Sequence, residues 1–161
     1  MTRSTIRIAL PTAAAMLLSV QLATADGPVS FQTSWSFSHG PVDPTYMAIK
    51  SHEQWLQLWR RIKDDHDGSG IGLNIDKIPE TDFNRYTLIV AGSGKKPMSG
   101  YAVSFRSVIE GRDAIRVTVL ETGPGSRCAG DTISTSPFIG ALIPATGKKV
   151  IFETKYAEAT C

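Results

Sequence analysis

The sequence predicts an α+β fold in which one amphipathic helix packs on a mostly antiparallel sheet. Three observations lead to this prediction. Apolar and polar residues alternate over several short runs, which is the period of a half-buried strand. A single stretch carries apolar residues at helical spacing. Short segments rich in Gly, Pro, Asp and Ser separate these runs and are typical of turns.

The first predicted strand covers residues 29–37. Val29, Phe31, Thr33, Trp35 and Phe37 fall on one side of it, and three serines and a glutamine lie between them. This strict alternation indicates a strand with one buried face. A loop with two prolines, residues 40–44, follows it.

The predicted helix begins after Ser51. Ser51 can act as the N-cap, and Gln54 stands at the third helical position, which together make a capping box. The residues that follow place one apolar stripe at positions i, i+3, i+4 and i+7: Trp55, Leu58, Trp59 and Ile62. Arg60, Arg61 and Lys63 lie toward the end, where cations suit the helix dipole. We expect the apolar stripe to pack on the sheet.

The other strands are predicted from short apolar runs. Residues 88–91 form a continuous apolar run, which indicates a buried central strand. Residues 100–109 and 115–119 alternate on either side of a turn and are predicted to form a hairpin. Residues 138–143 and 150–152 supply two more strands.

Residues 1–25 are expected to be a secretory signal peptide. Arg3 and Arg7 give a positive start, an apolar stretch follows, and Ala23-Thr24-Ala25 has the pattern of a cleavage site. The apolar stretch is shorter than the roughly 20 residues of a membrane span. We therefore expect residues 26–161 to be a single exported domain, periplasmic or secreted, with no membrane insertion after cleavage.

The charge balance argues against nucleic acid as a partner. The chain has 17 Lys and Arg against 15 Asp and Glu, and loss of Arg3 and Arg7 with the signal leaves 15 against 15. A neutral domain has no electrostatic reason to bind a phosphate backbone.

Cys128 and Cys161 remain in the expected mature domain. An even pair in an oxidising compartment favours a disulfide, here between the last residue and a loop 33 positions earlier. The alternative is a reactive thiol or a metal ligand, but no histidine neighbours either cysteine in the sequence.

One pattern suggests a calcium site. Asp65, Asp67, Ser69 and Asp76 occur at the spacing of an EF-hand loop after the predicted helix. The closing residue is Asp instead of Glu, and Pro79 interrupts the segment where the second helix would lie. We therefore favour a solvated loop and keep these four residues as weak metal candidates.

The sequence offers no catalytic constellation, and no cofactor is expected. Gly92-Ser93-Gly94-Lys95-Lys96 lacks the features of a phosphate-binding loop, since Lys96 stands where Ser or Thr belongs and Pro97 follows. No nucleophile elbow is present. His39, His52 and His66 are not flanked by groups that orient a catalytic base, and we expect them at the surface. These observations predict a protein that is not an enzyme.

A set of small motifs distributed along the chain resembles one known family. They are Ile49-Lys50-Ser51 with Trp55, Leu58 and Trp59; Asp82-Phe83 before the strand at Leu88; Gly94-Lys95-Lys96-Pro97 with Gly100-Tyr101; Cys128; and Ser136-Pro137-Phe138. Their order and spacing resemble the C-terminal domain of the protease-complex subunit PrcB family over roughly residues 47–145. The resemblance implies a non-catalytic exported domain that associates with and stabilises a secreted or envelope protease complex.

The segment from Lys95 to Tyr101 is the predicted binding site. Its candidate binding residues are Lys95, Lys96, Pro97, Met98, Gly100 and Tyr101. Pro97 restricts φ, and Gly100 suits a positive φ, which is typical of a shaped loop. Two other functions remain open. Pro97-Met98-Ser99-Gly100-Tyr101 is similar to the loop with which chagasin-type inhibitors enter a cysteine protease, and Asp65–Asp76 would make the domain a calcium-binding envelope module.

Overall fold

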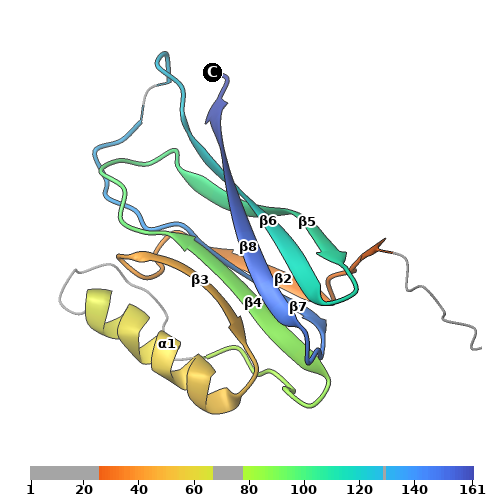
Figure 1. The fold of residues 1–161 in the computed structure, drawn as a ribbon. Coiled ribbons are helices and arrows are strands. Elements are labelled where there is room, and N and C mark those ends of the chain that lie inside the picture. Colours follow the sequence, from red (N-terminus) through yellow and green to blue (C-terminus); the bar gives the residue numbers. More distant parts are fainter. Residues whose placement is uncertain (1–25, 67–77, 129) are drawn as a thin grey trace, which may run out of the picture.

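Two four-stranded sheets pack face to face, and one helix covers the outer face of the second sheet (Figure 1). The structure, a computed structural model, describes residues 26–66, 78–128 and 130–161. The elements of these residues are β1 (Gly27–Pro28), β2 (Thr33–Phe37), β3 (Pro44–Ile49), α1 (His52–His66), β4 (Tyr86–Ser93), β5 (Ala102–Glu110), β6 (Ala114–Pro124), β7 (Phe138–Pro144) and β8 (Lys149–Ala159).

The chain passes repeatedly from one sheet to the other. The first sheet has the strand order β1-β5-β6-β8, and the second has the order β2-β7-β4-β3. β6 and β8 pair in parallel, and every other pair in the two sheets is antiparallel. The connections from β4 to β5 and from β6 to β7 both cross between the sheets, and they lie side by side at one end of the molecule.

The prediction of an α+β fold was wrong, because the protein is mostly β. The predicted fold has all strands in one sheet with the helix on one face. In the structure the strands divide between two sheets, and the helix forms a third layer on the second sheet. A short apolar run indicates a buried strand equally well in either arrangement, so the run alone does not decide the number of sheets.

The strand β4 shows how the layers are built. Ile89 and Ala91 point into the core between the two sheets, where they meet Val117 and Val119 of β6. Leu88 and its alternate neighbours point the other way, toward α1. A strand that is covered on both faces needs apolar residues at every position, which explains the continuous run at 88–91.

The predicted helix is confirmed, with its apolar stripe on the second sheet. Trp55, Leu58 and Ile62 are buried, and Trp59 packs partly buried beside them. Ser51 Oγ accepts the backbone N–H of Gln54 at 3.3 Å, as the capping box predicts. The Gln54 side chain reaches one residue further back than expected and accepts the N–H of Lys50. Within the described ranges no helix has the length and apolar character to cross a membrane.

Of the first predicted strand, 29–37, only residues 33–37 form a strand, β2, and β1 lies just before the predicted range. β1 pairs with β5 in the first sheet, whereas β2 pairs with β7 in the second. The intervening residues carry the chain from one sheet to the other. The edge strand β3 was not predicted, because it begins at Pro44, the second of the two prolines that indicated a loop.

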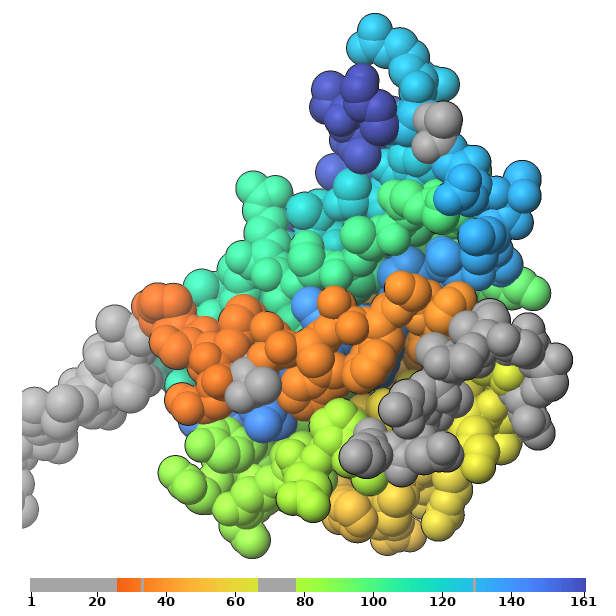
Figure 2. Space-filling model, turned by 180° about the vertical axis from the view of Figure 1, so that it is seen from behind, coloured from red at the N-terminus to blue at the C-terminus, as the bar shows by residue number. Residues whose placement is uncertain are grey.

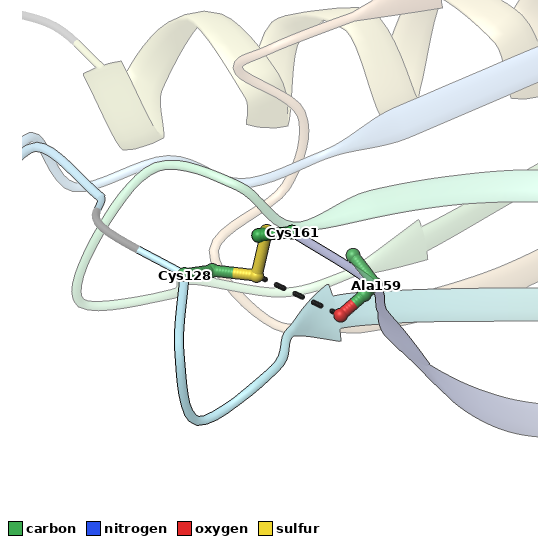
Figure 3. Close-up of a disulfide and its surroundings, with 3 residues drawn as sticks. All are labelled: Cys128, Ala159 and Cys161. Atoms are coloured by element: carbon green, nitrogen blue, oxygen red, sulfur yellow. Dashed lines mark hydrogen bonds between the residues drawn. A yellow bond between two sulfur atoms is a disulfide. The ribbon is translucent and has the colours of Figure 1, made fainter.

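The predicted disulfide between Cys128 and Cys161 is present, with Cα atoms 5.3 Å apart (Figure 3). It joins the segment after β6 to the residue that ends the chain beyond β8. The same segment approaches β8 closely at Gly125, where a Cβ would lie 2.5 Å from the Ala159 carbonyl oxygen. Figure 2 shows this end of the chain projecting from the rest of the molecule. The disulfide therefore ties together an extension that the second sheet does not cover.

Candidate functional site

The predicted binding segment, Lys95–Tyr101, crosses the open end of the sandwich, and we call it the crossing loop. It leads from β4 in the second sheet to β5 in the first. Gly100 has φ of 93°, as expected, and Gly94 just before the loop has φ of 74°. A Cβ at Gly94 would also lie 2.9 Å from Pro44 Cδ. Glycine is therefore required at both ends of the loop by its backbone conformation.

The backbone of the crossing loop is held by the segment between β6 and β7. Lys96 donates its N–H to Thr135 O at 2.7 Å, and Thr135 donates its N–H to Lys96 O at 3.1 Å. Ser99 and Asp131 make a second reciprocal pair at 3.1 and 3.0 Å. These four hydrogen bonds join residues distant in the sequence and fix the shape of the loop in advance of any binding event.

The crossing loop exposes some of its predicted binding residues and packs others. Lys95, Pro97 and Gly100 are exposed, whereas Lys96, Met98 and Tyr101 are half-buried. The Met98 methyl group lies 2.5 Å from the position that a Cβ at Gly130 would take, so this side chain packs on the neighbouring segment.

A groove of about 330 Å³ lies on one side of the crossing loop. Phe37 and Phe138 belong to its walls together with Tyr101 and Val103 at the start of the first sheet. Three serines also line it: Ser36, Ser38 and Ser99. None of its described lining residues is Asp, Glu, His, Lys or Arg, so the groove offers apolar surface and hydroxyl groups.

Two residues of the crossing loop also belong to a group that we call the tyrosine–lysine cluster: Tyr46, Lys96, Tyr101, Glu121 and Tyr156. The Tyr46 hydroxyl donates a hydrogen bond to Glu121. Lys96 Nζ lies 3.7 Å from the other Glu121 carboxylate oxygen and 5.5 Å from the centre of the Tyr101 ring. Lys96 thus has an anion and an aromatic ring as neighbours, both favourable for a cation.

Burial strengthens the interactions inside the cluster. The Lys96 and Glu121 side chains are 23% and 20% exposed. Burial, followed by the hydrogen bond to Glu121 and the charge of that carboxylate, raises the pKa of Tyr46 far above its usual value. Tyr46 therefore keeps its proton and remains a hydrogen-bond donor to Glu121.

The missing side chain of Gly123 leaves the space that Tyr101 and Tyr156 occupy. A Cβ at Gly123 would collide with the Tyr156 hydroxyl and would lie 3.1 Å from Tyr101 Cε1. Tyr156 is nevertheless 62% exposed. The cluster thus continues the crossing loop into an exposed aromatic surface.

Lys96 and Tyr101 were predicted as binding residues, whereas Tyr46, Glu121 and Tyr156 were not. One signal was present for Glu121. It continues the inward-facing series of Val117 and Val119 on β6. A carboxylate at an inward-facing position is expected to be hydrogen-bonded or paired with a cation. Nothing local in the sequence indicates that β3 and β8 bring tyrosines to this acid.

Replacing Glu121 by leucine is expected to lower the free energy of unfolding by about 1 to 3 kcal/mol. The change leaves the half-buried Lys96 ammonium and the Tyr46 hydroxyl without their shared acceptor. Glu121→Gln keeps an acceptor for Tyr46 and should cost less. Urea denaturation measures both, with the exposed Glu80→Gln as a control. A leucine variant as stable as the wild type would contradict the role given to this carboxylate.

A smaller cavity of about 200 Å³ lies beside Lys95 and contains two histidines. The His39 and His66 rings are 5.6 Å apart, and both are half-buried instead of fully at the surface as predicted. Ser136 is 1% exposed and donates a hydrogen bond to Gly40 O at 2.9 Å. His66 Nε2 lies 2.7 Å from the same carbonyl oxygen and 3.3 Å from Ser136 Oγ.

This arrangement does not activate Ser136 as a nucleophile. A carbonyl oxygen only accepts hydrogen bonds, so His66 Nε2 carries a proton in its contact with Gly40. The same nitrogen cannot then accept the proton of Ser136, which is what a general base must do. We infer that Ser136 and His66 have a structural role, because both donate hydrogen bonds to the Gly40 carbonyl oxygen.

Acidification is expected to destabilise the protein through His39. Burial, and then the charge of His66, lower the pKa of His39 below 6.5. Because the unfolded chain binds this proton more readily, the free energy of unfolding falls as the pH drops below about 6.5. Denaturant titrations between about pH 7 and pH 5 should show a flatter profile for His39→Asn than for the wild type. An equally steep profile in the variant would exclude His39 as the cause.

The calcium candidates fall mostly outside the described residues, since Asp67, Ser69 and Asp76 lie within 67–77. Asp65 is described, and its Oδ2 accepts the backbone N–H of Val42 at 3.0 Å. In the ranges that the structure covers, no group of three or more His, Cys, Asp or Glu side chains could hold a metal ion.

Residues 87–144 match the family model described as PrcB C-terminal. This segment is therefore similar to the PrcB C-terminal family. The match runs from β4 to β7 and contains the whole crossing loop and Glu121. The resemblance inferred from the sequence began near residue 47, but β3 and α1 lie outside the match. No curated protein and no solved structure matches the chain significantly. The PrcB match points to a role related to a protease complex.

Proposed function

We propose that this protein is an exported, non-catalytic subunit that associates with a secreted or envelope protease and stabilises the complex. The observation that carries the proposal is the PrcB C-terminal match over β4 to β7. Export rests on the signal-like residues 1–25 and agrees with the disulfide between Cys128 and Cys161.

The crossing loop is the surface that we propose for this association. It lies within the matched segment and presents Lys95 and Pro97 to solvent. Two exposed apolar side chains flank it at the same end of the molecule, Ile133 at 60% and Tyr156 at 62% exposure. A rigid loop with a cation, an aromatic ring and an aliphatic side chain has the composition of an interface hot spot.

The hydrogen bonds of the loop favour a subunit over a protease inhibitor. An inhibitor loop of the chagasin type has to enter a narrow cleft. Here Lys96 and Ser99 are bonded to the neighbouring segment, and Met98 packs on Gly130. The accessible surface is therefore broad and formed by two segments together, which suits a flat contact between subunits.

Reversing the charge and polarity of this surface tests the proposal. The double variant Lys95→Glu/Ile133→Ser changes two exposed side chains and should leave the melting temperature within the range of ordinary surface substitutions. We expect recovery of the protease with the tagged protein from envelope extract to fall at least about tenfold, because hot-spot losses reach 2 kcal/mol or more.

The matched control is Met47→Ser/Arg112→Glu, which makes the same kinds of change at exposed positions away from the loop. Met47 lies on the edge strand β3, and Arg112 lies in the turn at the far end of β5. The control should recover the protease as the wild type does. Equal recovery with both double variants, at unchanged melting temperature, would remove the crossing loop from the interface.

A further inference from the structure

The last strand of the protein has an unpaired edge. β8 spans 11 residues and pairs with β6 on one side, and it stands last in the order of the first sheet. Outside the sheet ladders, no backbone–backbone hydrogen bond of the described residues involves Lys149–Ala159. Figure 1 shows β8 at the edge of its sheet, with its end extending past the second sheet. Half of the backbone donors and acceptors of such a strand are available for pairing with another chain.

The residues in the middle of β8 are complementary to themselves. A second copy of β8 can pair antiparallel with the first about a two-fold axis through Thr154. Each Phe152 then lies opposite Tyr156 of the other copy, and each Glu153 lies opposite Lys155. Opposite residues of an antiparallel pair share a face of the sheet, so one face gains two aromatic pairs and the other gains two ion pairs.

The charges also select this register. Residues 153–156 are all exposed, so no other part of the described chain covers their side chains. Moving the two-fold axis from Thr154 to Glu153 would place Glu153 of one copy opposite Glu153 of the other. Moving the axis to Lys155 would place the two copies of Lys155 opposite each other. Like charges directly opposite destabilise a strand pair. Charged residues often protect an edge strand from any pairing, but among these three symmetric registers only the one about Thr154 places Glu153 opposite Lys155.

The shape of the protein allows the second copy to approach. The second sheet covers the beginning of β8, where the Tyr46 ring lies 6.3 Å from the Phe152 ring. It does not cover the end of β8, which projects with the disulfide (Figure 2). Antiparallel pairing places the covered half of each β8 beside the projecting half of the other. The two bodies therefore lie at opposite ends of the paired strands.

We infer that two copies of this protein form a dimer through antiparallel pairing of their β8 strands about Thr154. The dimer joins the two first sheets into one continuous sheet with β8 strands at its centre. This interaction does not depend on the proposed protease partner and is measured with the purified protein alone.

Charge reversal tests the interface. Sedimentation equilibrium of residues 26–161 should show a dimer in equilibrium with monomer. Glu153→Lys and Lys155→Glu should each raise the dissociation constant at least about tenfold, because both ion pairs become repulsive. The double variant Glu153→Lys/Lys155→Glu restores opposite charges and should return the constant to near the wild-type value. A wild-type protein that stays monomeric, or a dimer that ignores these changes, would overturn the inference.

A cysteine at the axis tests the register. In Thr154→Cys the two thiols would lie directly opposite, with Cβ atoms about 4.5 to 5.5 Å apart, close enough for a disulfide after a small adjustment. Oxidation should therefore give a covalent dimer on a non-reducing gel. The matched control Glu158→Cys lies on the same strand, but its two copies would be about 26 Å apart. Equal cross-linking of both variants, or none of Thr154→Cys, would reject pairing about Thr154.

Discussion

Replacing Trp55 by alanine is expected to lower the free energy of unfolding by about 3 to 5 kcal/mol. Trp55 is fully buried between α1 and the second sheet, and its ring lies 5.2 Å from the Trp59 ring. Its indole N–H also donates a hydrogen bond to Pro79 O at 3.0 Å. The substitution removes apolar contacts, leaves a cavity and deprives the Pro79 carbonyl of its donor.

Two further variants separate these contributions. Trp55→Phe keeps most of the buried area but lacks the hydrogen bond, so we expect an intermediate loss. Gln57→Ala at an exposed position of α1 should stay within about 0.5 kcal/mol of the wild type. Urea denaturation monitored by circular dichroism measures all three. A loss below about 1 kcal/mol for Trp55→Ala would contradict the assignment of α1 as an integral third layer.

Replacing both Cys128 and Cys161 by serine is expected to cost about 3 to 4 kcal/mol. The disulfide closes a loop of 33 residues, and opening it returns that conformational freedom to the unfolded chain. The loop contains β7 and β8, so the restriction acts on strands of both sheets. The bond also holds the uncovered end of β8 beside the segment after β6, where Cys128 Sγ lies 3.6 Å from Ala159 O (Figure 3).

The disulfide prediction has its own internal check. Reduction of the wild-type protein should lower its stability to that of the double serine variant, and reduction should not change the variant. Thermal unfolding with and without reductant measures both. Equal stability of the oxidised protein and the variant would show that the bond adds nothing to the fold.

The sequence predicted the separate elements better than their arrangement. The helix at Trp55 and the strand at 88–91 depend on local spacing, which the amino acids themselves display. The division of strands between two sheets depends on partners far along the chain. Alternation at 29–37 predicts a single strand, but Val29 packs on the core between the sheets, whereas Trp35 and Phe37 of β2 pack on the core beneath α1. The parallel pairing of β6 and β8 likewise leaves no local signal, since β7 between them belongs to the other sheet.

The candidate site follows the same pattern. Gly100 and Pro97 indicated a shaped loop because their backbone preferences are local. Only Lys96 and Tyr101 of the tyrosine–lysine cluster were predicted, because the hydrogen bond from the Tyr46 hydroxyl to Glu121 spans 75 residues of sequence. His39 and His66 were predicted at the surface, and their partial burial was not foreseen for the same reason. His66 at the end of α1 meets Ser136, 70 residues away.

Turnover by the protease that co-purifies with the tagged protein tests the proposed function most directly. A non-catalytic stabilising subunit should leave the initial rate of peptide hydrolysis unchanged and should lengthen the time over which activity persists. Lys95→Glu/Ile133→Ser should lose that protection, and Met47→Ser/Arg112→Glu should retain it. A fall in the initial rate with increasing amounts of the wild-type protein would contradict this account and would identify the protein as an inhibitor.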